Sequence, residues 1–84
     1  MKKDTIPSID IIEFYNRTVD NATQRINNSD LPRENEIKFY YQKLSTIILL
    51  MESVSIIDYK TYSEYAEQLD IFLHSEDTKL LQKL

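Results

Sequence analysis

The chain contains no glycine among its 84 residues. At average usage, which is about 7%, about six glycines would be expected. Glycine takes positive φ at little steric cost, so tight β-hairpins and phosphate-cradling loops depend on it. Its absence argues against β-rich folds and excludes the P-loop and the dinucleotide-binding fingerprint. We therefore expect an all-α fold with short linkers.

Apolar side chains recur every three or four residues in three separate stretches, which predicts three amphipathic helices. These helices cover about residues 8–26, 32–53 and 59–74. Their apolar stripes are Ile12, Tyr15, Val19, Ala22 and Ile26; Ile37, Tyr40 or Tyr41, Leu44, Ile47 or Ile48 and Met51; and Tyr62, Ala66, Leu69 and Phe72 or Leu73.

Proline and small polar residues mark the starts of the first two helices. Pro7 and Pro32 fit a first helical turn, where a missing backbone N–H costs little. Ser8 is a candidate cap for the first helix, and Ser29 or Asp30 for the second.

The third helix has two candidate starts. Thr61 and Glu64 fit a capping box, and Asp58 is a competing cap one turn earlier. Residues 77–84 either continue this helix or form a short fourth one, and the polar residues at 75–77 favour the break. The sequence thus predicts one helical domain over residues 1–84, a small antiparallel three-helix bundle with or without a fourth helix.

Helix 32–53 carries more apolar residues than one stripe requires. Phe39 and Leu50 lie on roughly the opposite side from the stripe, and Leu49 is also off it. One interpretation is that this helix is central and packed on both sides. The other is that these three residues form an exposed patch for a partner or for a second copy of the chain.

Negative charge is concentrated toward the third helix. Residues 1–51 carry seven acidic and seven basic side chains, whereas residues 52–77 carry seven acidic ones and only Lys60. Such a surface is either a solvated face or the complement of a basic protein partner. The predicted partner-binding residues are Tyr59, Glu64, Tyr65, Glu67, Asp70 and Ile71.

The composition offers little for catalysis or for cofactors. There is no cysteine and only one histidine, His74, so we expect no metal site and no cofactor. Glu64 and Glu67 share a helical face, but any acidic helix shows that spacing. The basic residues are scattered, which argues against direct nucleic-acid binding. The longest apolar run, residues 47–51, is too short to span a membrane.

By elimination, we expect a non-enzymatic cytoplasmic protein that binds another protein as a regulator or inhibitor. Immunity proteins, antitoxins and phage-encoded inhibitors offer analogies of size and composition. One alternative is a homodimeric or larger structural protein that associates through Phe39, Leu49 and Leu50. The other is a transcriptional or nucleoid modulator that contacts DNA through a basic partner.

Overall fold

The computed structural model describes residues 8–28 and 33–84. Three helices, α1 (Ser8–Asn28), α2 (Arg33–Ser53) and α3 (Tyr59–Ser75), are followed by the 3-10 turn η1 (Thr78–Leu80). No strand occurs in these two ranges. The predicted all-α three-helix fold is therefore confirmed. The signals expected at Pro7, Ser29, Asp30 and Pro32 lie outside the described residues.

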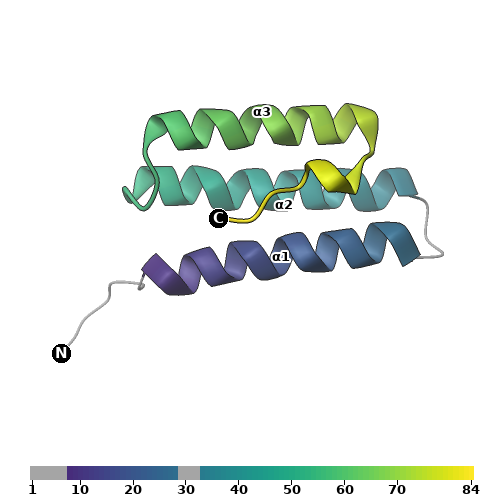
Figure 1. Cartoon of the computed structure of the whole chain (residues 1–84), viewed down its shortest axis with the longest axis horizontal. Helices are drawn as coiled ribbons and strands as arrows, with labels where there is room; N and C mark the ends of the chain where they lie inside the picture. The colour runs from purple at the N-terminus through teal and green to yellow at the C-terminus, as the bar shows by residue number, and fades with distance from the viewer. Residues whose placement is uncertain (1–7, 29–32) are drawn as a thin grey trace.

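Helix α2 lies between α1 and α3 in a nearly flat layer (Figure 1). The extents along the principal axes are 46 × 26 × 16 Å, so the molecule is flattened. Both outer helices pack on α2, whereas the backbones of α1 and α3 do not approach each other. Long side chains bridge them instead, such as Tyr15 and Tyr65, whose ring centroids are 6.2 Å apart.

The predicted stripes form the core. In α2, both Ile47 and Ile48 are buried, and Tyr40 is buried while Tyr41 is half-buried. Helix α1 adds Ile11, which the predicted stripe omits. The buried side chains form two adjoining clusters, one of Ile11, Tyr15, Val19, Leu44, Ile47, Ile48, Met51 and Leu69, the other of Ala22, Ile26, Ile37, Tyr40 and Phe72.

The ends of α3 use side chains and a left-handed residue in place of glycine. Asp58 is the N-cap, and its carboxylate accepts a hydrogen bond from the backbone N–H of Thr61 at 2.8 Å. The hydrogen bonds from Thr61 hold the pKa of the Asp58 carboxyl below its usual range. Of the two predicted starts, the structure therefore uses the earlier one. At the other end, Glu76 has φ 59° and ends the helix with its N–H bonded to the Phe72 carbonyl.

The turn after α2 also needs a left-handed residue, which is Ser55 at φ 65°. An L-residue pays a steric penalty of about 1–2 kcal/mol there, because Cβ crowds the following carbonyl oxygen. We predict that Ser55→Gly raises the free energy of unfolding by about 0.5–1 kcal/mol, since relief of strain outweighs the added entropy of the unfolded chain. Ser63→Gly, inside α3, is the matched control and should lower it by a similar amount. Urea unfolding of both variants measures this, and a loss of stability in Ser55→Gly would contradict it.

Residues 77–84 do not form the short fourth helix that the sequence suggested. Glu76 turns the chain back, and the Asp77 carboxylate caps one 3-10 turn by accepting from the N–H of Lys79. Residues 81–84 then run without helical structure across α2, between α1 and α3 (Figure 1). There Leu81 and Leu84 pack against the core, so burial and side-chain hydrogen bonds replace helical ones.

Side chains of α1 and α3 hold the backbone of this segment. The Asn16 amide donates to the Leu84 carbonyl at 3.1 Å and accepts from the Leu84 N–H at 2.7 Å. The Tyr65 hydroxyl donates to the Lys83 carbonyl at 2.9 Å, and the Lys83 ammonium lies 2.8 Å from the Asp20 carboxylate. The segment therefore closes one side of the layer.

We predict that Asn16→Ala releases this segment, because both hydrogen bonds to Leu84 are lost. Two hydrogen bonds contribute about 1–3 kcal/mol together. The control is Asn21→Ala in the same helix, whose side chain is exposed. Helix propensity cancels between the two variants, so Asn16→Ala should be less stable than Asn21→Ala by that amount and should lose hydrogen-exchange protection at the Leu84 amide. Equal stability of the two variants would mean that the hydrogen bonds between Asn16 and Leu84 do not hold the C-terminal segment in place.

Candidate protein-binding surfaces

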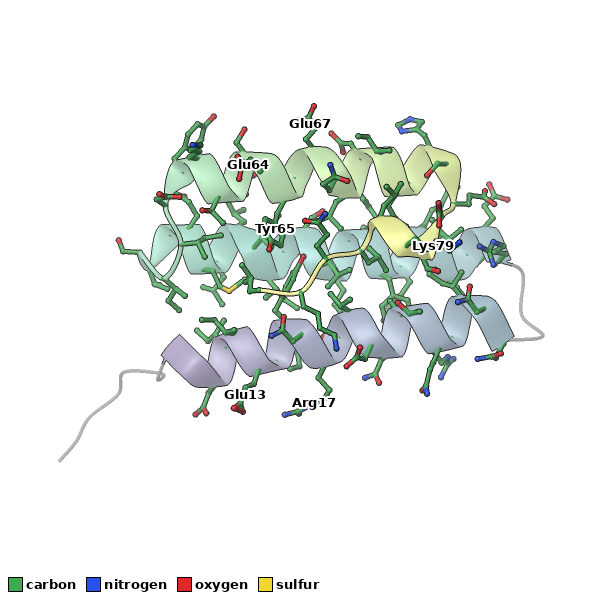
Figure 2. The ribbon with its side chains drawn as sticks, viewed as in Figure 1. Glu13, Arg17, Glu64, Tyr65, Glu67 and Lys79 are labelled. Carbon is green, nitrogen blue, oxygen red and sulfur yellow. The ribbon has the colours of Figure 1, made fainter. Side chains whose placement is uncertain are left out.

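The six residues predicted to bind a partner lie on three sides of α3. Glu64, Glu67 and Ile71 are exposed on its outer edge, and Figure 2 shows both glutamates pointing away from the bundle. Ile71 is 43% exposed. These three form an exposed outer edge of α3 with two acidic side chains and one apolar side chain.

Tyr65 lies on a different side, toward residues 81–84 (Figure 2). It is half-buried and supports the C-terminal segment through its hydroxyl. Partial burial, and secondarily the charge of Glu64, raise the pKa of the Tyr65 phenol. The Tyr65 hydroxyl is thus already hydrogen-bonded within the chain, to the Lys83 carbonyl.

Tyr59 and Asp70 lie on the third side of α3. Tyr59 is exposed, with its ring centroid 6.1 Å from that of Tyr62. The Asp70 carboxylate accepts a hydrogen bond from the Tyr41 hydroxyl of α2 at 2.8 Å, and this bond raises the pKa of Tyr41. Asp70 is therefore engaged in joining α3 to α2. Binding of a partner by the α3 residues stays a prediction, but they do not share one continuous surface.

The large exposed apolar residues of α2 gather away from its buried stripe. Phe39 is 56% exposed, Leu49 51% and Leu50 46%. Helix α2 is central and both α1 and α3 pack on it, as one interpretation predicted, but the two helices pack on neighbouring flanks and leave Phe39, Leu49 and Leu50 exposed. This result favours the exposed patch.

Helix α1 adds Phe14 to this surface. Asn16 faces the C-terminal segment, and Phe14 precedes it by two residues, which places the two side chains on opposite sides of the helix. Phe14 is 45% exposed, and the Lys43 ammonium lies 5.7 Å from its ring centroid. We call this surface the open face, and it consists of Phe14 of α1 and Phe39, Lys43, Thr46, Leu49 and Leu50 of α2.

Lys43 stands at the centre of the open face between two aromatic rings. Its ammonium is 5.8 Å from the Phe39 centroid, so it interacts with the faces of both Phe14 and Phe39. Phe39 in turn packs edge-on against Tyr40, with centroids 5.0 Å apart. A shallow hollow of about 450 Å³ lies beside Lys43, lined by Phe39, Gln42, Lys43, Thr46 and Ile47.

Lys43 has no ion-pair partner among the described residues. The other described cations of α2 are both paired, Arg33 with Glu76 and Lys38 with Glu34. Nearby, the buried Glu36 pairs with Arg25 of α1 at 3.6 Å, which neutralises that edge of the face. The open face is thus apolar with one uncompensated positive charge, in a chain whose net charge is −4.

The described residues contain no group of three or more acidic or histidine side chains that could hold a metal ion. None of the three helices is long and apolar enough to cross a membrane. His74 is exposed, and its Nδ1 is hydrogen-bonded to the Asp70 carbonyl at 2.8 Å.

Comparisons with known proteins identify no relative. No family model, curated protein or solved structure matches the chain. A functional assignment therefore depends on the geometry of its own residues.

Sequence reasoning identified Phe39, Leu49 and Leu50, and helical spacing also gave signals for the other three members of the open face, Phe14, Lys43 and Thr46. Phe14 was recognisable as an apolar residue off the stripe of α1, yet the sequence did not show which helix it faces. Lys43 was recognisable by its spacing of four residues from Phe39. Its position over two rings required the packing of α1 on α2.

We predict that Phe39→Gln changes the free energy of unfolding by less than about 1 kcal/mol, because an exposed side chain loses little buried area. If no second copy covers the open face, the midpoint of thermal unfolding of the wild type does not depend on protein concentration. A midpoint that rises with concentration in the wild type, but not in Phe39→Gln, would mean that a second copy covers the open face.

Proposed function

We propose that this chain is a non-catalytic protein-binding regulator, and that the open face is its partner-binding surface. One observation carries the proposal: Phe39 and Leu50 are about half exposed on either side of a lysine that has no carboxylate partner among the described residues. Contiguous apolar surface of this kind marks interaction sites in proteins that otherwise bury such side chains.

The composition of the open face supports a protein ligand. Aromatic side chains are enriched in the cores of protein interfaces, and Lys43 adds a single positive charge beside the two rings. The face is also carried by helices, so its residues are held in place before a partner arrives. Binding therefore costs little conformational entropy at Phe14, Phe39 and Leu50.

The acidic edge of α3 has a different role in this proposal. Glu64 and Glu67 are exposed and point away from the bundle, so they act on a partner mainly through the electrostatic field of their charges. Such a field speeds encounter with a partner that has basic regions and discourages acidic competitors. An inhibitor or regulator that works by occupying a surface of its target needs no more chemistry than this.

The experiment compares two charge insertions at exposed apolar sites. Phe39→Asp combined with Leu50→Asp disrupts the open face, whereas Ile71→Asp disrupts the outer edge of α3. Each tagged variant is expressed in the native host and cross-linked in the cell, and captured proteins are quantified by mass spectrometry. We expect one protein to be captured by the wild type and by Ile71→Asp, and to be reduced about 10-fold or more with the double variant.

Loss of that protein with Ile71→Asp and its retention by the double variant would contradict the proposal and assign binding to α3. Retention by both variants would exclude both surfaces. Circular dichroism of each purified variant shows that the helices are intact, which is expected because the substituted positions are exposed.

A further inference from the structure

The shape and charge of the open face indicate what kind of segment covers it. We infer that it receives one amphipathic α-helix of the partner, and that this helix carries an Asp or Glu side chain that pairs with Lys43. The inference rests on the proposed function and specifies the ligand of the same surface.

The first argument is the spacing along α2. Phe39, Lys43, Thr46 and Leu50 follow one another at intervals of four, three and four residues. This is the a/d spacing of a coiled-coil seam, which keeps side chains in line beside a second helix. The seam is about 16 Å long at 1.5 Å per residue, so two or three turns of a partner helix can lie along it.

The second argument is the shape of the layer. Phe14 of α1 stands beside Lys43 and Phe39 of α2, so the open face has a wall on the α1 side. A helix placed there touches two antiparallel helices at the usual interaxial distance of about 8–10 Å. The three-helix layer is closed on one side by residues 81–84, and such a helix would cover the other. The result resembles a four-helix bundle.

The third argument is the charge of Lys43. Covering the open face removes water from the ammonium, and an unpaired buried charge costs several kcal/mol unless a partner compensates it. No described carboxylate of this chain pairs with Lys43. A carboxylate on the incoming helix would therefore satisfy it, while the Lys43 stem and the two rings contact the apolar side chains.

The same charge argues against a second copy as the occupant. An antiparallel copy that packs Phe39 against Leu50 has its two-fold axis between residues 44 and 45. The two Lys43 residues would then be offset by only about 4.5 Å along the helix direction, across an interaxial distance of about 8–10 Å, so that two like charges would share one interface. An acidic helix avoids this repulsion.

The test uses a displayed library of helical peptides as long as α2, randomised along one face. The library is sorted for binding to the wild type in the presence of excess unlabelled Phe39→Asp, so that only peptides on the open face are retained. We expect these peptides to share apolar residues at spacings of three and four with one Asp or Glu among them. They should bind Lys43→Glu about 10-fold or more weakly, bind Lys43→Arg nearly as well as the wild type, and be unaffected by Ile71→Asp.

Three outcomes would overturn the inference. One is that the retained peptides lack an acidic preference or bind Lys43→Glu equally well, and another is that no peptide is retained. The third is sedimentation of a wild-type dimer that Phe39→Asp abolishes and Lys43→Met strengthens, since this assigns the face to a second copy.

The proposed function is judged separately. A cellular partner whose capture requires Phe39 and Leu50 but is unchanged by Lys43→Glu would leave the proposed function standing and remove this inference.

Discussion

The packing of two helices on neighbouring flanks of α2 is the interaction on which the rest of the structure depends. Leu44, Ile48 and Met51 are almost completely buried, whereas the backbones of α1 and α3 do not meet. The bundle is consequently a layer, and a layer has two sides to cover. Residues 81–84 cover one side by packing two leucines and by bonding to Asn16 and Tyr65. No described residue covers the other, so the apolar residues that α2 carries beyond its core stripe stay exposed.

The absence of glycine shapes the ends of the helices as well as the fold class. Two helices end at left-handed residues, Ser55 and Glu76, where glycine is usual, and each costs local strain. Glu76 offsets part of this cost through Arg33, whose guanidinium donates to the Glu76 carbonyl at 2.7 Å and to the Ile26 carbonyl at 3.1 Å. One side chain at the start of α2 thus satisfies carbonyls near the ends of α1 and α3.

The helices were predictable because periodicity is local: every residue needed to place Tyr15, Val19 and Ala22 on one stripe lies within α1. The coverage of α2 was not predictable in this way. The same excess of apolar residues describes a helix enclosed on both sides and a helix with one free side, and only the position of its neighbours distinguishes them. The C-terminal segment was harder still, since Asn16 and Leu84 are separated by 68 residues and their contact is between side chain and backbone. For the α3 residues, helical angles show on which side of the helix each side chain lies but not what it contacts. The hydrogen bond from Tyr65 to the Lys83 carbonyl was therefore not predictable.

The open face also links binding to stability. A domain of this size buries only a modest share of its surface, so its folded state has little stability to spare. A partner that binds only the folded chain adds RT ln(1 + [L]/Kd), which is about 2.7 kcal/mol at a concentration 100 times Kd. Part of that gain would come from covering Phe39 and Leu50, which contribute little to the core while they are half exposed. The complex would thus bury apolar area that the isolated fold leaves in water. Lys43 limits which helices can bind there, because a helix without a carboxylate would bury the Lys43 ammonium unpaired.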